Sequence, residues 1–359
     1  MAEARTGGIN IRHLYKIFGS NPKAYIDAVQ KGLSKTELNE KHGHVLGLRD
    51  ISIDIPSGCI QVIMGLSGSG KSTLIRHINR LIDPTVGEVL IDGVDVVKMN
   101  QMELRSFRRL QTAMVFQKFA LLPHRTVLDN TAFGLEVQGM ERAKTVDIAM
   151  RWLERVGLKG FEQRYPNQLS GGMQQRVGLA RALANDAPVL LMDEAYSALD
   201  PLIRTDMQLV LLDIQKEIKK TIVFITHDLD EALRLGDQIA ILRDGEVIQQ
   251  GTSQDIVLRP ADEYVANFVK EVNRGRVVHV EAVMSLLRPG VPVTGPKIAA
   301  GTTIEEAMRF LAPLPDGDAV VTSPEGEPIG LVTFRQLAGA MVNSEVSDKV
   351  PMGAVSLAG

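Results

Sequence analysis

The chain has few of the features that mark secreted, membrane-spanning or cysteine-ligated proteins. It has one cysteine in 359 residues, which excludes an internal disulfide and a metal site built from cysteines. Cys59 directly precedes an apolar run, and we expect it to be a small core residue. No uninterrupted apolar run reaches the roughly 18 residues that cross a bilayer. Residues 1–10 lack the apolar segment of a secretion signal, so we expect a cytosolic protein.

An excess of positive charge is also missing. The chain carries 40 Lys and Arg against 43 Asp and Glu, a net charge of −3. This balance lacks the excess of positive charge that general nucleic-acid binding requires, and we expect no nucleic-acid partner. The remaining composition, with 45% hydrophobic and 23% charged residues, is that of an ordinary globular protein. The length suits about two domains, each with its own core.

Residues 65–73 have the layout of a phosphate-binding loop. They read Gly-Leu-Ser-Gly-Ser-Gly-Lys-Ser-Thr and follow the apolar run 60–64, so a strand leads into a turn and a helix begins near Ser72. The glycines let successive backbone N–H groups and the helix N-terminus converge on one anion. Lys71 would reach the β- and γ-phosphates, and the Ser72 hydroxyl would hold Mg²⁺. The predicted nucleotide-binding residues of this loop are Gly65, Ser67, Gly68, Ser69, Gly70, Lys71, Ser72 and Thr73.

A second apolar run, Val189 to Met192, ends in Asp193 and Glu194. It predicts a buried parallel strand whose carboxyl end carries the two acids, where an open α/β sheet binds its ligands. Asp193 would support Mg²⁺ from its second shell, and Glu194 would polarise the attacking water.

Between these motifs lies the sequence Leu-Ser-Gly-Gly-Met-Gln-Gln-Arg at 169–176. Ser170 is a good helix N-cap, and Gly171 and Gly172 leave backbone N–H groups free to approach an anion. On the residues alone this is a capped helix start or an anion-binding motif. It resembles the signature of ATP-binding-cassette (ABC) ATPases, and the resemblance covers about residues 9–272.

The resemblance implies a homodimer that traps two ATP molecules head to tail, the signature of one subunit closing over the phosphate loop of the other. It implies that Gln117 senses Mg²⁺ and the attacking water and that His227 contacts the γ-phosphate. It also implies that the loop from Ser197 to Asp200 crosses the dimer interface. The resemblance thereby assigns catalysis to Lys71, Gln117, Glu194 and His227. It assigns metal binding to Ser72, Gln117 and Asp193. Further nucleotide contacts are assigned to Gln117, Ser170, Gly171, Gly172, Gln174 and Asp200.

The adenine ring needs an aromatic platform, and the family supplies one where this chain has Tyr15 and Phe18. Phe18 directly precedes a glycine and is the preferred candidate, with Tyr15 as the alternative. In this chain 46 residues separate Phe18 from Gly65, more than is usual in the family.

The extra length is an insert at about 20–45. Helical spacing and a capping box at Ser34 and Glu37 predict a helical hairpin. We expect His42 and His44 to lie in a solvated turn. The insert resembles that of ATPase subunits from glycine betaine/proline-type osmolyte importers, as does the run Asp-Glu-Ala-Tyr-Ser-Ala-Leu-Asp at 193–200. A surface elaboration without function is the alternative.

The region 118–180 resembles the helical subdomain on which membrane partners dock. Residues near the Gln117 loop would form the groove for a coupling helix. Arg105, Arg108 and Arg109 are interpreted as a solvated helix face and not as a binding patch.

The C-terminal part, 276–359, is predicted as a second domain after an ATPase domain at 1–275, with a linker at 273–276. The pattern predicts a hairpin with an Asp-Gly turn at 239–250, a helix at 303–311, strands at 318–322 and 328–333, and a helix at 334–341. The last four resemble one cystathionine-β-synthase-type (CBS) repeat. Gln336 stands where ribose-binding versions carry Asp, so ribose binding is not expected. A sensor and a structural contact remain open.

The sequence therefore predicts an α/β fold, a P-loop ABC-type nucleotide-binding domain with a helical subdomain, plus a small α+β CBS-like domain. The resemblance implies the ATP- and Mg²⁺-binding subunit of an importer for a compatible solute, peripheral on the cytoplasmic face of the inner membrane. Its partners would be transmembrane permease subunits and a solute-binding protein. The alternatives are a soluble ABC ATPase of DNA repair or translation, and a nucleotide-sensing regulator.

Overall fold

The computed structural model describes residues 7–117, 119–197, 199–287, 295–314 and 317–341. They divide into two compact units, 1–250 and 251–359. The domain limits proposed from the sequence, with a boundary after 275, stay predictions. Within the described ranges, no helix is both long and apolar enough to span a bilayer.

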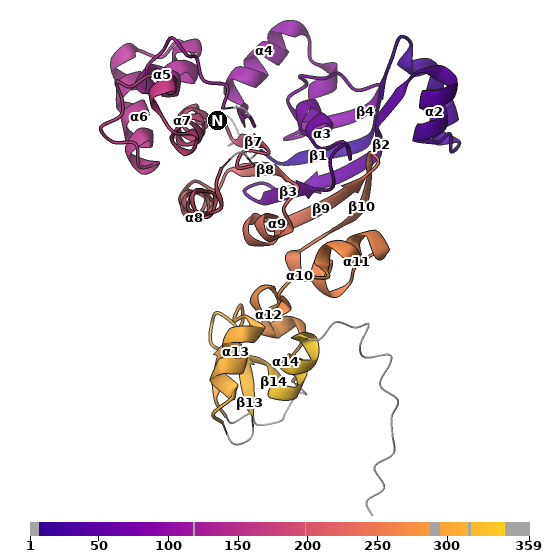
Figure 1. Ribbon diagram of the computed structural model, residues 1–359, viewed down its shortest axis with the longest axis vertical. Helices are drawn as coiled ribbons and strands as arrows, with labels where there is room; N and C mark the ends of the chain where they lie inside the picture. The colour runs from indigo at the N-terminus through magenta and orange to yellow at the C-terminus, as the bar shows by residue number, and fades with distance from the viewer. Residues whose placement is uncertain (1–6, 118, 198, 288–294, 315–316, 342–359) are drawn as a thin grey trace, which may run out of the picture. The chain divides into compact units, whose positions relative to one another are not determined.

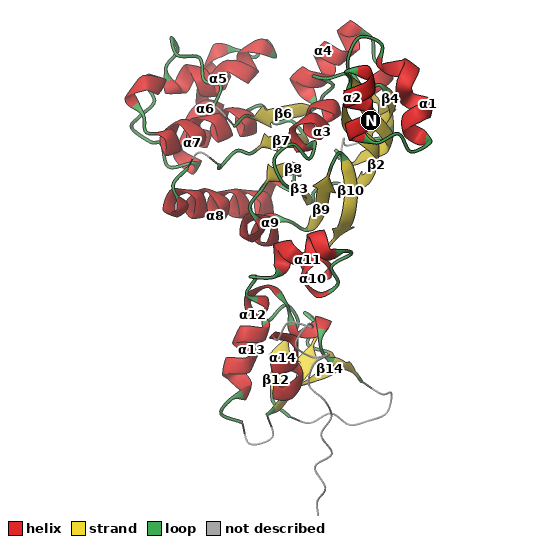
Figure 2. Ribbon diagram, turned by 45° about the vertical axis from the view of Figure 1, so that its right-hand side comes forward, coloured by secondary structure: helices red, strands yellow, loops and turns green. Residues whose placement is uncertain are grey.

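The first unit holds two sheets (Figures 1 and 2). One is antiparallel, in the order β2-β1-β4-β5, with bounds β1 Ile9–Phe18, β2 Val45–Ile55, β4 Val86–Ile91 and β5 Val94–Asp95. The other has the order β10-β9-β3-β8-β7-β6, with bounds β3 Ile60–Met64, β6 Thr112–Val115, β7 Val189–Asp193, β8 Thr221–Thr226, β9 Gln238–Arg243 and β10 Glu246–Gly251.

Nine α-helices and three short 3-10 helices are described in this unit. The α-helices are α1 Ile26–Gln30, α2 Lys35–His42, α3 Lys71–Ile78, α4 Gln101–Leu110, α5 Val127–Val137, α6 Arg142–Arg155, α7 Gly171–Ala184, α8 Pro201–Ile218 and α9 Leu229–Leu235. The 3-10 helices are η1 Pro22–Tyr25, η2 Val96–Lys98 and η3 Pro166–Gln168. One apolar core joins both sheets through α3 and includes Ile9, Leu48, Ile63, Ile75 and Leu191.

The register of the parallel strands brings four loops to one edge. Met64 of β3 pairs with Thr226 of β8, and Ile225 of β8 pairs with Asp193 of β7. β6 lies beside β7 and also runs parallel to it. Because parallel strands end at the same edge, the segments after β3, β6, β7 and β8 leave the sheet side by side. Gln117, Glu194 and His227 lie just beyond three of these strand ends, and Lys71 begins the helix that follows β3.

The helices α5, α6 and α7 pack against one another as a helical group (Figure 1). Ser170 begins α7, and its hydroxyl accepts a hydrogen bond from the Met173 N–H at 3.3 Å. This confirms the N-cap predicted from the sequence. The hairpin of β9 and β10 is also as predicted, since Asp244 and Gly245 at its turn have φ of 52° and 86°.

The insert forms the predicted helical hairpin, α1 and α2, and the capping box of Ser34 and Glu37 is present. The prediction of a solvated turn is wrong for one of its histidines. His44 is buried, with its ring 4.5 Å from that of Tyr25 and its Nδ1 2.6 Å from the His42 carbonyl oxygen. The polar residues of the turn do not predict this burial, because the His44 ring lies against Tyr25 and Gly19, which come well before it in the chain.

Arg108 is a second correction, because it is not simply part of a solvated helix face. Its side chain donates to the carbonyl oxygens of Asn79, at 2.9 Å, and Arg80. These carbonyls follow the end of α3, where a guanidinium also suits the negative end of the helix dipole.

The second unit contains the predicted elements and additional ones. Its helices are α10 Ser253–Leu258, α11 Glu263–Val269, α12 Arg274–Val277, η4 Val280–Ala282, α13 Ile304–Leu311 and α14 Phe334–Met341. Its sheet has the order β11-β14-β13-β12, with bounds β11 Ser285–Leu286, β12 Lys297–Ala299, β13 Asp318–Thr322 and β14 Pro328–Thr333.

Side-chain hydrogen bonds bear on two sequence expectations in this unit, and one of them is changed. The predicted linker at 273–276 instead contains the start of α12, because Asn273 caps it through the Gly275 N–H. Gln336 accepts from the Thr333 N–H at 2.9 Å and donates to Ser285 at 2.8 Å. Its amide is therefore occupied within the unit, and the expectation that it does not hold a ribose stays a prediction.

Candidate functional site

The loop between β3 and α3 has the backbone of an anion-binding turn. Gly65, Gly68 and Gly70 have φ of 149°, 79° and 103°, which side-chain-bearing residues rarely adopt. A Cβ at Gly65 would clash with the Leu242 carbonyl oxygen, and one at Gly70 would lie 2.7 Å from the Gly47 carbonyl oxygen. The loop therefore requires glycine for its conformation and for its close neighbours.

Lys71 lies at the start of α3 with its side chain only 5% exposed. Its Nζ donates to the carbonyl oxygens of Gly65, at 2.8 Å, and Leu66, at 3.0 Å, and lies 3.9 Å from the Glu194 carboxylate. Burial lowers the pKa of Lys71, while Glu194 and Asp193 raise it. A desolvated ammonium held in this way attracts an anion in front of the loop.

The next residue, Ser72, meets the end of β7. Its hydroxyl donates to the Asp193 carboxylate at 2.8 Å, and Arg76 lies 3.1 Å from the other oxygen of that carboxylate. Asp193 is buried, with 3% of its surface exposed. The sequence analysis predicted that Ser72 and Asp193 lie at the same site, but it did not predict the ion pair of Arg76 with Asp193. Its position one turn after Ser72 on the same helix was the available signal.

Glu194 is the point where the predicted catalytic residues meet. Gln117 donates from Nε2 to its Oε2 at 2.9 Å, and Nδ1 of His227 lies 3.9 Å from the same oxygen. Lys71 approaches the other oxygen. Glu194 has φ of 45°, a conformation that costs a residue with a side chain free energy and that clusters at functional sites.

The residues present fit a nucleotide phosphate and a magnesium ion. The Ser69 hydroxyl is buried in the loop without a hydrogen-bond partner among the described residues, and it could donate to a phosphate. Ser72 and Asp193 supply hard oxygen ligands of the kind that Mg²⁺ prefers. No cluster of three or more His, Cys, Asp or Glu suited to a metal occurs in the described part of the chain. A magnesium ion that shares its coordination with phosphates and water needs no such cluster.

The structure separates the two adenine candidates. Tyr15 is 7% exposed and belongs to the apolar core beneath the insert. Phe18, at the end of β1, is 39% exposed, and its ring packs on Gly47, whose carbonyl oxygen faces Gly70. An accessible ring close to the phosphate loop favours Phe18, which stays a prediction.

The signature residues and Asp200 are placed elsewhere. Ser170, Gly171, Gly172 and Gln174 lie at the start of α7, and Asp200 caps α8 by accepting from the Ile203 N–H at 3.1 Å. Among the described hydrogen bonds and ion pairs, none joins these residues to the phosphate loop. One chain therefore presents a phosphate site and, separately, an exposed glycine-rich helix start.

The turn between β9 and β10 supports the loop and was not assigned to the site from the sequence. The Gly245 N–H donates to the Ser69 carbonyl oxygen at 3.0 Å, and its carbonyl oxygen accepts from the Arg49 N–H at 2.8 Å. The Asp-Gly pair predicted the turn, but only the fold places it against the phosphate loop.

Comparison with known proteins decides the family. The model of the ABC transporter family matches residues 48–197. The glycine betaine/proline betaine transport ATP-binding protein ProV of Salmonella typhimurium is 52% identical over 94% of this chain and 83% of its own length. The chain belongs to the ABC transporter ATP-binding family. It is an ATPase that energises transport, and the resemblance predicted from the sequence is confirmed.

Other relatives of this ABC ATPase agree. The trimethylamine N-oxide transport ATP-binding protein TmoW of Ruegeria pomeroyi is 46% identical over 90% of this chain and 93% of its own length. The dimeric structure of MJ0796, a bacterial ABC transporter cassette, matches with a TM-score of 0.59 and 33% identity, over 68% of this chain and 98% of that one. A second MJ0796 structure holds ADP and phosphate after hydrolysis. The predicted P-loop ABC fold and ATP as its ligand are thereby confirmed.

Proposed function

We propose that the chain is the ATP-hydrolysing subunit of an importer for a methylated amine, such as glycine betaine, proline betaine or choline. Relatives described as glycine betaine/proline betaine and trimethylamine N-oxide transport proteins, at 46–52% identity, support this solute class. The convergence of Lys71, Gln117 and His227 on Glu194 is the observation that carries the ATPase assignment.

The roles of the site residues follow from their geometry. Gly65 to Thr73 would hold the phosphates with backbone N–H groups and the Lys71 ammonium. Glu194 would polarise the attacking water, oriented by Gln117 and His227, which approach the same carboxylate oxygen. Ser72, Gln117 and Asp193 would hold Mg²⁺, which supplies charge neutralisation when bound. Phe18 would stack on the adenine ring.

A homodimer would complete the site. The exposed start of α7, with Ser170, Gly171, Gly172 and Gln174, would close over the phosphate loop of the partner. Asp200 would lie at the same interface. Support comes from the separation of these residues from the phosphate loop within one chain and from the dimeric state of the MJ0796 cassette.

The permease would dock beside α4 and α5, and this docking would hold the protein peripherally at the cytoplasmic face of the inner membrane. A pocket of about 200 Å³ is lined there by Arg109, Met114, Phe133 and Val137, among others. Phe133 and Val137 are 36% and 52% exposed, and the nearby Met102 is 79% exposed. An apolar surface edged by arginines suits a helix of a membrane protein. A solute-binding protein would complete the complex.

The C-terminal region at 276–359 would be a regulatory module that resembles a CBS repeat, either a sensor or a structural contact. Its α-β-β-α order with β13 antiparallel to β14 supports this proposal. The same sheet also contains β11 and β12.

The proposal is tested by ATP hydrolysis in vesicles that contain the chain, its permease and its solute-binding protein. We expect glycine betaine or a related methylated amine to stimulate hydrolysis, whereas methionine, the cargo named for more distant relatives, does not. Equal rates with and without every methylated amine tried would contradict the solute class. A rate that stays at background in all cases would contradict the catalytic assignment.

A further inference from the structure

The segment that carries Gln117 runs from the end of β6 to the start of α5. The next described residues after Gln117 are Phe119 and Ala120, which have φ of 29° and 49°. Both values lie in the left-handed region that side-chain-bearing residues avoid. Such a conformation persists only where neighbouring groups hold it, so the contacts of this segment bear on the placement of Gln117.

One neighbour is α7, the helix that begins at the signature. Arg181 on α7 donates from Nη1 to the Ala120 carbonyl oxygen at 2.7 Å and from Nη2 to the Phe119 carbonyl oxygen at 3.2 Å. The segment also lies close to the glycines of this helix. A Cβ at Gly171 would be 3.6 Å from the Phe119 ring, and one at Gly178 would be 3.7 Å from the Phe119 carbonyl oxygen. Phe119 and Ala120 are therefore held against α7 by hydrogen bonds and by close packing.

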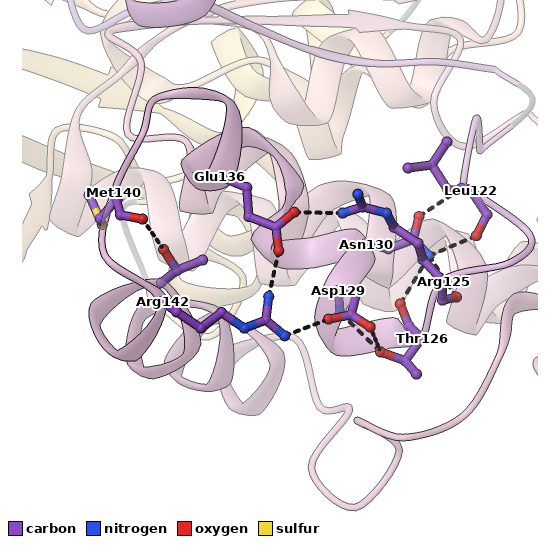
Figure 3. Close-up of polar contacts among 9 residues, drawn as sticks. Leu122, Arg125, Thr126, Asp129, Asn130, Glu136, Met140 and Arg142 are labelled. Atoms are coloured by element: carbon purple, nitrogen blue, oxygen red, sulfur yellow. Dashed lines mark hydrogen bonds and ion pairs between the residues drawn. The ribbon is translucent and has the colours of Figure 1, made fainter.

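The second neighbour is Asn130 of α5, which has no exposed surface. Its Oδ1 accepts from the Leu122 N–H at 2.7 Å. Its Nδ2 donates to the carbonyl oxygens of Leu122, Arg125 and Thr126 at 3.0, 3.1 and 3.0 Å. Figure 3 shows this amide inside the turn that it holds closed.

Around Asn130, ion pairs tie the same turn to α5 and α6 (Figure 3). Arg125 lies 2.6 Å from Glu136, and its guanidinium stacks over the Phe133 ring at 5.1 Å. Arg142 of α6 bridges Asp129, at 2.8 Å, and Glu136, at 2.5 Å. The end of the segment is thus held by α5, and Arg142 links α5 to α6.

We propose that Arg181 and Asn130 are positioning residues for Gln117. They hold residues 119–126 against α7 and α5 so that the Gln117 amide meets the Glu194 carboxylate at 2.9 Å. Because Arg181 stands on the helix that begins at the signature, the placement of Gln117 depends on the placement of that helix. This inference builds on the proposed role of Gln117 in hydrolysis.

Single substitutions in the full-length chain give the first test. Arg181→Gln removes the fork that holds two carbonyls, and Asn130→Asp keeps an acceptor but loses the two N–H groups that three carbonyls share. We expect each to lower kcat by about tenfold while the affinity for a fluorescent ATP analogue changes by less than about twofold. Arg181→Lys should recover part of the loss. Arg155→Ala, which removes an exposed arginine paired with Glu217, is the matched control and should leave both quantities unchanged.

A double-mutant cycle separates positioning from a general structural effect. If Arg181 acts through Gln117, the pair Gln117→Ala and Arg181→Gln should be no slower than Gln117→Ala alone. Losses that multiply in the double variant would overturn the proposal, as would an Arg181→Gln variant with full kcat. Should Arg181→Gln fail to fold by circular dichroism, Arg181→Lys and Asn130→Asp enter the same cycle.

The outcome also distinguishes the inference from the proposed function. Full turnover in Gln117→Ala would contradict the role of Gln117 in hydrolysis, and the inference would fall with it. Reduced turnover in Gln117→Ala together with multiplying losses would contradict only the positioning role of Arg181 and Asn130.

Discussion

At the scale of single residues, Glu194 differs from the other site residues because three different side chains approach its carboxylate. Lys71 approaches Oε1, while Gln117 and His227 approach Oε2. The carboxylate thus accepts a hydrogen bond from an amide and lies 3.9 Å from an ammonium and from an imidazole, and 19% of the side chain is exposed.

The first prediction is that Glu194→Gln binds ATP but loses most turnover. The amide keeps the size of the carboxylate and loses its negative charge, so we expect phosphate release to fall at least about a hundredfold. Binding is measured with a fluorescent ATP analogue and turnover by phosphate release. Glu217→Gln, at an exposed ion pair, serves as the control. Undiminished phosphate release in Glu194→Gln would refute the assigned role.

The second prediction compares two glycines that share a φ of 103°. An alanine at either position adopts an unfavourable left-handed conformation that costs about 1–2 kcal/mol of stability. At Gly32 the new Cβ meets open space, whereas at Gly70 it lies 2.7 Å from the Gly47 carbonyl oxygen. We therefore expect Gly70→Ala to be the less stable variant in urea and to lose ATP binding. Gly32→Ala should keep it, and equal behaviour of the two variants would contradict this account of the loop.

The third prediction concerns pH and the buried imidazole of His77 on α3. Burial lowers the pKa of His77 from 6.5 to about 4, so the folded chain keeps it neutral where the unfolded chain protonates it. The free energy of unfolding should then fall as pH drops from about 6.5 towards 4, by up to about 3 kcal/mol from this group. Urea unfolding at pH 7.5 and pH 5 measures the change. His77→Gln should show a smaller change between the two pH values, and an equal change would exclude His77 as its source.

How far the sequence predicts individual residues depends on whether their partners are local. The phosphate loop and the Ser170 cap follow from patterns within ten residues, and they are found as expected. The burial of His44 and the contact of Arg181 with Phe119 depend on segments that only the tertiary fold brings together. The left-handed φ of Glu194 leaves no mark in the sequence, because glycine or asparagine would signal such a turn and glutamate does not.

At the scale of elements, the insert is joined to the site through its last residue. The His44 ring occupies the space beside Gly19, where a Cβ would clash with it, and Gly19 follows the exposed Phe18. Lys35 of α2 also lies 3.3 Å from Asp244, in the turn that supports the phosphate loop. The hairpin therefore braces the backbone at the proposed adenine platform.

The fourth prediction follows from this bracing. His44→Ala removes a buried ring that packs against the Tyr25 ring in a tilted arrangement, and we expect a loss of about 1–3 kcal/mol in stability. Because Phe18 lies next to the braced glycine, KM for ATP should rise about threefold with little change in kcat. Glu40→Ala, at an exposed position of α2, is the control. An unchanged KM in His44→Ala would separate the insert from nucleotide binding.

The elements themselves were predicted more fully than their contacts. Strands β3, β7 and β8 are apolar runs bounded by turns, as the sequence indicates, whereas the position of β8 between β3 and β7 comes from the tertiary fold. The side chain of Arg108 shows the limit of this reasoning, since a charged residue on an amphipathic helix gives no sign that it caps another helix.

At the scale of the whole molecule, no described hydrogen bond or ion pair joins the phosphate loop to the signature of the same chain, so we expect activity to depend on the proposed dimer. The fifth prediction is that Glu194→Gln forms a dimer when ATP and Mg²⁺ are present and remains a monomer with ADP. Mass measured by light scattering during gel filtration reports the state. Ser170→Arg, which puts a bulky cation at the exposed helix start, should prevent the dimer. A monomer under all conditions, even with the permease present, would contradict the sandwich arrangement.

The hairpin α1–α2 also offers a position at which this protein can be labelled. Its tip at Gly32 is exposed, and there a Cβ would meet no other atom within 4 Å. Lengthening a loop costs little because closure entropy grows only with the logarithm of its length. A short epitope or a fluorophore inserted after Lys31 would therefore leave the sheet edge untouched, and it would allow labelled and unlabelled copies to be counted in a mixed assembly.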